Sequence, residues 1–179
     1  MKQLSFTIVL ISMLLASCGG SGSDSTSTPT VNDPVASLSS TVWKKECVPH
    51  RDIGSDDSHT LWNANVNLTI DASMKSTYKT EFFHPTDTEC NVMMFDTLHI
   101  SSFEIAGKVM SEESVEAFRL NETFTYSSAK EMPAENYTLI YIDSERLYFG
   151  QNSGDNLGKT PETRHSSISL DEYFSQIVN

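Results

Sequence analysis

Asn65-Val66-Asn67-Leu68-Thr69-Ile70 decides the fold class of this chain, because apolar and polar residues alternate along it without a break. Val66, Leu68 and Ile70 fall on one side of an extended chain, and the residues between them fall on the other. This is the pattern of a β-strand with one buried face. Asp71-Ala72-Ser73 follows directly and has the composition of a turn.

Further strands are predicted on both sides of this stretch. They cover residues 42–48, 61–70, 75–83, 92–105 (as one long strand or two short ones), 117–126, 137–142 and 146–149. Residues 170–177 are predicted as a short terminal helix or a final strand. Residues 111–118 carry a helix-like stretch with Ser111 as its N-cap. The sequence therefore predicts an all-β fold, an antiparallel barrel or sandwich of about 7–9 short strands with one or two short helices.

Before this region, residues 19–40 consist mostly of Gly, Ser, Thr, Asp and Pro. Such a segment cannot bury enough apolar surface to offset its loss of conformational entropy, so we expect a flexible tether over residues 18–40. Residues 41–179 have a globular composition and the length of one domain. We expect a single β-rich domain there.

Residues 1–18 resemble the signal peptide of a bacterial lipoprotein. Lys2 provides the positive charge, an apolar run extends from Leu4 to Leu15, and Leu15-Ala16-Ser17-Cys18 matches a lipobox. The run is shorter than the roughly 20 residues of a membrane-spanning helix. The resemblance implies that residues 1–17 are removed and that fatty acids such as palmitate are attached to Cys18, which anchors the protein in a membrane. An ordinary secretory signal is the alternative.

Gly19 follows the cysteine, where an aspartate would indicate retention in the inner membrane of enteric bacteria. This favours the outer membrane, with the domain on the periplasmic face or at the cell surface. Without Lys2, the 12 basic residues become 11 against 24 acidic ones, so the formal net charge changes from −12 to −13. Nucleic acid is therefore not an expected partner, because binding it would add repulsion.

Once Cys18 is lipidated, two cysteines remain, Cys47 and Cys90. An even pair in an oxidising compartment predicts a disulfide, with two free buried thiols as the alternative. We do not expect a metal site on them, because neither has a second cysteine or a histidine at close ligand spacing.

The domain also resembles small lipocalin-like lipoprotein domains of Gram-negative bacteria, an uncharacterised group. The resemblance rests on short motifs at Trp43, Cys47, Cys90, Tyr141, Asp143, Leu147, Tyr148, Phe149 and Gly150, and on the closing segments 160–164 and 169–171. It implies a small β-barrel in the cell envelope. Thr41-Val42-Trp43 stands where lipocalins proper carry Gly-x-Trp.

No motif predicts catalysis or a cofactor. The five histidines include no His-x-His or His-Glu-x-x-His pair, and there is neither a Gly-x-Ser-x-Gly elbow nor a phosphate-binding glycine loop. Asp52, Asp56, Asp57 and His59 could surround a divalent cation, but their spacing does not follow the calcium-loop template. We favour a solvated acidic loop, and we expect no metal, no cofactor and no enzymatic activity.

The aromatic side chains near the predicted terminal hairpin are the candidates for a ligand-lined interior. They are Tyr137, Tyr141, Tyr148 and Phe149. An eight-stranded barrel is just wide enough for side chains to fill, so these residues could equally pack a closed core, which is the interpretation we favour.

Together these observations predict a lipid-anchored envelope protein whose β-barrel has a non-enzymatic binding or accessory role. Its partners are expected to be the membrane, through Cys18, and a protein, glycan or small molecule. One alternative is a carrier of a small apolar ligand, and another is a periplasmic immunity protein whose acidic face covers a toxin.

Overall fold

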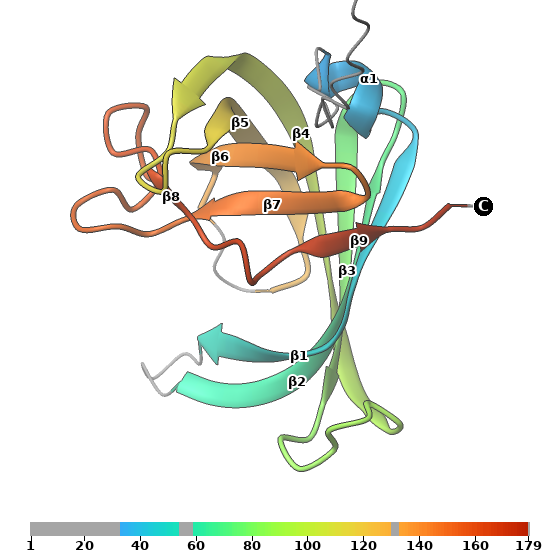
Figure 1. Ribbon diagram of the computed structural model, residues 1–179. Coiled ribbons are helices and arrows are strands. Elements are labelled where there is room, and N and C mark those ends of the chain that lie inside the picture. The colour runs from blue at the N-terminus through green and yellow to red at the C-terminus, as the bar shows by residue number, and fades with distance from the viewer. Residues whose placement is uncertain (1–32, 54–58, 130–132, 179) are drawn as a thin grey trace, which may run out of the picture.

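The computed structural model describes residues 33–53, 59–129 and 133–178, which form a closed antiparallel barrel of eight strands with one additional strand and one short helix (Figure 1). The elements are α1 (Pro34–Leu38), β1 (Thr41–Ile53), β2 (His59–Ile70), β3 (Lys75–Phe83), β4 (Met93–Met110), β5 (Glu116–Ser127), β6 (Glu135–Asp143), β7 (Arg146–Gln151), β8 (Ser167–Ile168) and β9 (Phe174–Gln176). The all-β prediction is confirmed, and of its two alternatives the barrel is the observed one.

Consecutive strands pair from β1 to β7, and β9 then closes the barrel between β7 and β1. All pairs are antiparallel. The additional strand β8 pairs with the end of β7, through Gly150 and Gln151. Because β9 pairs with both β1 and β7, neither of these strands leaves an unpaired edge there. Such edges can otherwise pair with other chains and cause aggregation.

Several strands match their predicted ranges closely. β3 has its predicted bounds, residues 93–105 of the predicted range form part of one long strand, and the end of the chain forms β9 rather than a helix. β1 is longer than predicted. It continues through Pro49 to Ile53, and Pro49 pairs with Asn63.

The helix predicted at residues 111–118 is wrong. Met110 pairs with Glu116, so only a tight five-residue turn connects β4 to β5, with Ser114 at a φ of 63°. The acidic residues of this turn bind the C-terminal segment instead. Glu112 accepts hydrogen bonds from Ser153 (2.7 Å) and Ser166 (2.5 Å), and Glu113 accepts one from the Ile168 N–H (2.8 Å).

The domain begins earlier than the predicted start at residue 41. Asp33 caps α1, since its Oδ1 accepts hydrogen bonds from the N–H groups of Val35 (3.0 Å) and Ala36 (3.2 Å). Leu38 is fully buried in the core at one end of the barrel. Residues 33–40 therefore belong to the folded domain, which corrects the predicted end of the tether. Among the described residues, none of the helices has the length and apolarity needed to cross a bilayer.

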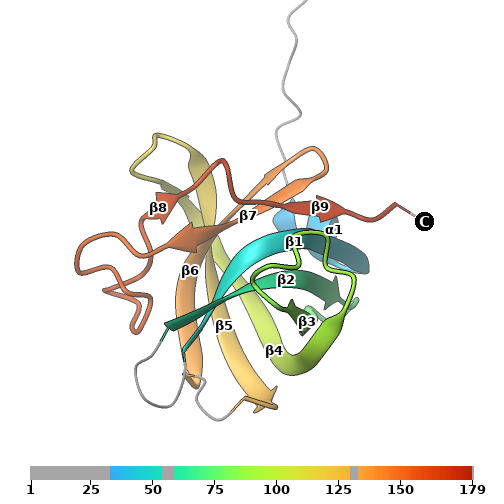
Figure 2. The same ribbon diagram turned by 90° about the horizontal axis from the view of Figure 1, so that it is seen from below.

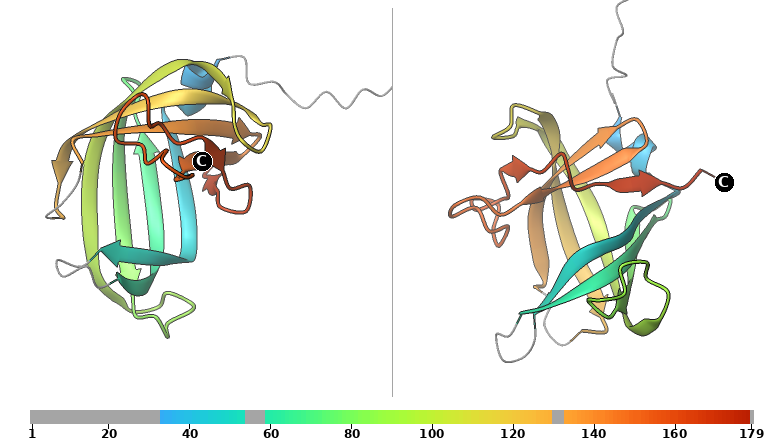
Figure 3. Two further views of the ribbon diagram at one scale, coloured as in Figure 1. Left: turned by 90° about the vertical axis from the view of Figure 1, so that its left-hand side faces the viewer. Right: turned by 60° about the horizontal axis from the view of Figure 1, so that its bottom comes forward.

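β1 and β2 bend across the lower end of the barrel, opposite α1 (Figures 1 and 3). The bend in β1 coincides with a bulge between Lys45 and Val48, where Cys47 has a φ of 46°. Bulges increase local bending and twist, and this bulge turns the strand. Seen from below, the β3–β4 loop lies beside the bent parts of β1 and β2 (Figure 2).

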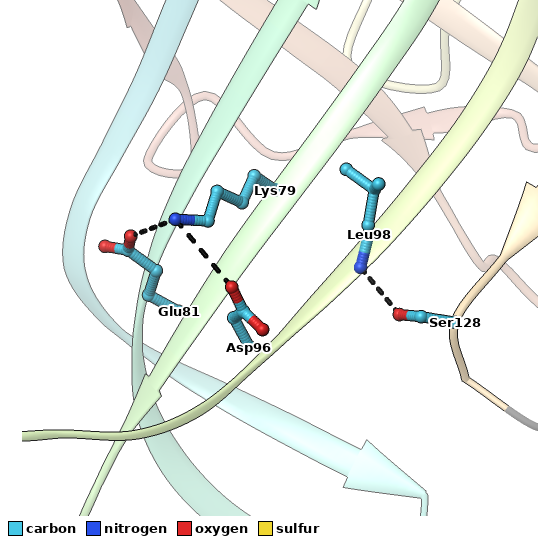
Figure 4. Close-up of polar contacts among 5 residues, drawn as sticks. All are labelled: Lys79, Glu81, Asp96, Leu98 and Ser128. Atoms are coloured by element: carbon cyan, nitrogen blue, oxygen red, sulfur yellow. Dashed lines mark hydrogen bonds and ion pairs between the residues drawn. The ribbon is translucent and has the colours of Figure 1, made fainter.

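The outer face of the barrel is charged where β3 and β4 run side by side. Lys79 lies between Glu81 (Nζ–O 2.7 Å) and Asp96 (3.7 Å), as Figure 4 shows. On the same wall, the Leu98 N–H donates to Ser128 Oγ at 2.7 Å and holds the end of β5 against β4. Because side chains alternate along a strand, the neighbouring residues of β3 and β4 face the barrel interior.

Candidate functional site

The interior of the barrel has two different halves. In the half next to α1, the inward-facing side chains are fully buried apolar groups: Trp43, Leu68, Ile70, Leu120, Ile140 and Leu147. In the half towards the β1–β2 hairpin, several inward-facing side chains keep part of their surface accessible to solvent, although Ala64 and Phe82 are buried there. The partly accessible side chains are Trp62, Phe95, Thr97, His99, Phe124 and Asn136. We call this half of the interior the open half.

Aromatic rings form one wall of the open half. The Trp62 ring meets Phe95 edge-on at 5.1 Å between centroids, and Phe95 stacks on Phe82 at 4.6 Å. The His50 ring meets the Phe82 ring edge-on, at 5.4 Å between centroids. Such offset and edge-to-face contacts hold rings in fixed positions, so this wall is a preformed apolar surface.

The Trp62 indole carries an unusual donor. Its Nε1 is buried, and among the described residues it has no hydrogen-bond partner. Leaving a buried N–H unpaired costs about 1–3 kcal/mol, which is why such groups are rare and call for an explanation.

A buried carboxyl group lies deeper in the interior. Glu122 Oε1 accepts a hydrogen bond from Ser101 Oγ (2.7 Å), and Oε2 accepts one from Asn136 Nδ2 (3.2 Å). Tyr78 also hydrogen-bonds to this carboxyl group, and Ser101 in turn contacts the hydroxyl of Ser76. Tyr78, Ser101, Glu122 and Asn136 form what we call the lumen cluster.

Burial governs the electrostatics of the lumen cluster. It raises the pKa of Glu122 above the usual value, and the three hydrogen-bond donors oppose this shift. Burial, together with the nearby Glu122 charge, also raises the pKa of Tyr78 well above its usual value. The cluster is therefore easier to keep neutral than the same groups in water, and it can both donate and accept hydrogen bonds.

His99 and Ser127 form a histidine–serine pair on the wall of the open half, with Nδ1 and Oγ 3.0 Å apart. The Ser127 hydroxyl also donates to the Ala129 carbonyl at 3.0 Å. Burial lowers the pKa of His99. The Ala129 N–H donates to Ser127 Oγ at 3.1 Å, so these contacts hold the chain at the end of β5.

The four predicted ligand-lining aromatics do not share one side of the barrel. Phe149 packs in the interior, between Tyr78 and Phe174. Tyr148 and Tyr141 pack on the outside in a second apolar cluster with Leu139 and Ile168. Adjacent residues of a strand face opposite sides, so Tyr148 and Phe149 cannot both line the interior. For the two outer tyrosines the predicted position is corrected.

Tyr137, the remaining predicted residue, also lies outside the interior. Its hydroxyl donates to Glu135 at 2.7 Å, and the guanidinium of Arg164 lies 5.4 Å from its ring centroid.

The predicted disulfide is present and joins Cys47 to Cys90, with their Cα atoms 5.6 Å apart. It links the bulge of β1 to the β3–β4 loop. Asn63 supports the same connection, because its Nδ2 donates to the Asp87 carbonyl at 2.9 Å.

Other predicted site residues lie outside the described part. Cys18, Asp56 and Asp57 are not among the described residues, and of Asp52 and His59 only the backbone is described, at the hairpin end of β1 and β2. The metal-site hypothesis for this loop therefore stays untested. Elsewhere in the described ranges, no group of three or more His, Cys, Asp or Glu side chains is arranged to hold a metal ion.

The sequence analysis missed the lumen cluster, although a signal for it is present. Phe118, Leu120 and Phe124 alternate along the strand predicted at 117–126, and Glu122 occupies the same face. A single glutamate on an apolar face predicts a buried carboxyl group. Comparisons with protein-family models, curated proteins and solved structures found no match, so the site is interpreted from its geometry alone.

Proposed function

We propose that this chain is a lipid-anchored envelope protein that binds a small, largely apolar molecule in the open half of its barrel. The observation that carries the proposal is the contrast between the two halves of the interior. One is closed by fully buried apolar side chains, whereas the other keeps rings and polar groups accessible. Mostly apolar walls with a few converging polar groups are typical of small-molecule sites.

The chemistry of the open half specifies the ligand class. Trp62 and Phe95 keep part of their rings accessible and offer apolar contact, and the buried Phe82 ring stacks on Phe95. Because an eight-stranded barrel has a narrow interior, the ligand is small. The proposal is of binding without catalysis.

A fluorescence titration with the neutral apolar probe N-phenyl-1-naphthylamine tests binding. We expect saturable binding at one site. Thr97→Phe places a ring in the open half and should weaken binding by about tenfold or more, equivalent to about 1.4 kcal/mol. Thr69→Phe is the matched control, because Thr69 is exposed on the outer face of β2. Equal affinities for the two variants, or no saturable binding, would contradict the proposal.

The lipid anchor is the second part of the proposal and rests on the resemblance of residues 1–18 to a lipoprotein signal. In a Gram-negative host fed radiolabelled palmitate, the protein should incorporate label and fractionate with the outer membrane. Cys18→Ser should incorporate none, since the thiol that carries the lipid is absent. Undiminished labelling of Cys18→Ser would refute the assignment of the anchor.

A further inference from the structure

A surface pocket of about 360 Å³ lies on the outer side of the barrel, separate from the open half. It is formed where the loop of residues 152–166 folds back over β4, β5 and β6. Its walls combine apolar side chains (Val109, Met110, Leu139) with charged ones (Arg119, Glu162, Arg164). The volume is within the range of small-ligand sites, about 300–1,000 Å³.

The loop is held against the barrel by backbone hydrogen bonds. The Tyr137 N–H donates to the Gly158 carbonyl at 2.8 Å, and the His165 N–H donates to the Tyr137 carbonyl at 3.1 Å. Gly158 has a φ of 70°, and a Cβ there would lie 2.6 Å from His165 Nε2. The wall of the pocket is therefore closely packed, which favours a preformed site.

Arg164 is fixed in position by three acceptors. Nη1 donates to the carbonyls of Leu120 (2.6 Å) and Thr138 (3.0 Å), and Nη2 donates to Asn121 Oδ1 (2.6 Å). All three acceptors are neutral, so they orient the guanidinium without neutralising its charge. Two of its five N–H groups remain available.

Arg119 faces the same pocket from β5 and is exposed. No carboxylate within the described ranges lies within 4 Å of either arginine, whereas Lys44, Lys45, Lys79 and Lys108 each pair with a glutamate. The two guanidinium groups repel each other, and this repulsion, after burial, contributes to lowering the pKa of Arg164. In a chain with a formal net charge of −12, two adjacent unneutralised arginines are an unusual local excess of positive charge.

We propose that this outer pocket binds a small organic anion, a phosphate or carboxylate group attached to a short apolar body. The anionic group would accept hydrogen bonds from Arg119 and from the free N–H groups of Arg164, which suit the oxygens of such groups. The apolar body would lie on Leu139, Val109 and Met110. Glu162 in the same wall opposes the anion and limits its affinity.

His165 adds no charge to the site. Its Nδ1 lies 2.9 Å from Thr138 Oγ1, and burial lowers its pKa below the usual value. The positive charge that the anion meets therefore comes from the two arginines.

Isothermal titration calorimetry of the full chain with phenyl phosphate and with inorganic phosphate tests the proposal. We expect one saturable site for phenyl phosphate and weaker binding of inorganic phosphate, which lacks the apolar body. Arg119→Gln should weaken phenyl phosphate binding by about tenfold, the loss expected for a hydrogen bond between charged groups. Because Arg119 is exposed and unpaired, the variant should keep the circular dichroism spectrum of the parent.

Lys159→Gln is the matched control, because Lys159 is exposed on the same loop and is absent from the walls of the pocket. It should leave the affinity within about twofold of the parent, since exposed charges beyond direct contact are screened by salt. Glu162→Gln should strengthen binding. Absence of saturable binding, or equal weakening by Arg119→Gln and Lys159→Gln, would overturn the proposal. Thr97→Phe, which tests the barrel interior, should not change phenyl phosphate binding, so the two proposals fail separately.

Discussion

At the scale of single residues, the unusual feature is a carboxyl group inside an apolar barrel. Glu122 is 4% exposed, and its described partners are neutral donors rather than a cation. A buried carboxyl group without a cation favours its protonated form. The folded protein therefore holds the Glu122 proton more tightly than the unfolded chain does.

This linkage predicts how stability depends on pH. The stabilisation that comes from protonated Glu122 is fully present below the pKa of this group in the unfolded chain, ordinarily 4.5. It is lost as the pH rises through the higher pKa of the folded protein. Glu122→Gln stays neutral and does not lose it. As the pH rises, the free energy of unfolding of Glu122→Gln should therefore increase relative to that of the parent. The increase should be about 1.4 kcal/mol for each pH unit between the unfolded-state and folded-state pKa values of Glu122.

Urea unfolding of both proteins at a series of pH values measures this difference. Glu104→Gln is the matched control, because Glu104 is exposed on β4 and its carboxylate accepts a hydrogen bond from Asn121 Nδ2. The control should show no such trend. If the stabilities of the parent and Glu122→Gln changed in parallel with pH, burial would not raise the pKa of Glu122.

The position of Glu122 could be predicted from sequence, but its environment could not. Alternation with Phe118, Leu120 and Phe124 places it on the inner face of its strand. Ser101 and Asn136 approach it because of the register in which β4 and β6 pair with β5, and no local pattern specifies that register. Local alternation gives the face of a residue, whereas its neighbours depend on the register of the sheet.

At the scale of elements, α1 shows where composition misleads. Residues 33–38 follow a Ser/Thr-rich segment, yet Asp33-Pro34 is a helix start signal and Leu38 is an apolar anchor. The opposite error occurred at residues 111–118, where Ser111 and the following glutamates resemble a helix start. There Glu112 and Glu113 bind the serines of the C-terminal segment, an interaction between residues far apart in sequence.

The same glutamates are strong acceptors. Burial alone would raise the pKa of Glu113. Hydrogen bonds from Ser167 and the Ile168 N–H outweigh this effect and lower that pKa to about 2. The contact between the β4–β5 turn and β8 therefore persists in mildly acidic solution.

The burial of α1 predicts the effect of shortening its anchor. Leu38→Ala should lower the free energy of unfolding by about 2–5 kcal/mol, because it leaves a cavity at the closed end of the barrel. Val35→Ala is the control, since Val35 is 43% exposed, and it should change stability by about 0.5 kcal/mol or less. Chemical denaturation measures both, and equal small effects would show that α1 does not cap the core.

The disulfide predicts a second effect on stability. The bond closes a loop with a sequence separation of 43 residues, and the chain-entropy account assigns such a loop about 4 kcal/mol. The double variant Cys47→Ala/Cys90→Ala should lose a stabilisation of this order in a denaturant titration. A loss below about 1 kcal/mol would mean that Asn63 and its contact with Asp87 already fix the loop.

At the scale of the whole molecule, the sequence predicted an all-β fold because the signals for it are local. Alternation and turn residues specify strands, and short connections specify antiparallel neighbours. Closure of the barrel, by contrast, has no local signal. It depends on β9, three residues that pair with β1 and β7 across the full length of the domain. The local pattern is consequently compatible with both a barrel and a sandwich, and it does not specify the boundary between the closed and open halves.

This boundary gives the molecule its proposed use. α1 and the apolar half close one end of the barrel, and the bent hairpin of β1 and β2 lies across the other end (Figure 3). Under this proposal, stability and binding depend on different parts of one barrel.

The central claim is that the open half holds a small molecule, and native mass spectrometry of the full chain purified from cells that express it tests this most directly. We predict a non-covalent adduct that disappears on denaturation, persists in Thr69→Phe and is absent from Thr97→Phe. A bare protein mass, or an adduct that both variants retain equally, would contradict the claim and direct attention to the outer surface of the barrel instead.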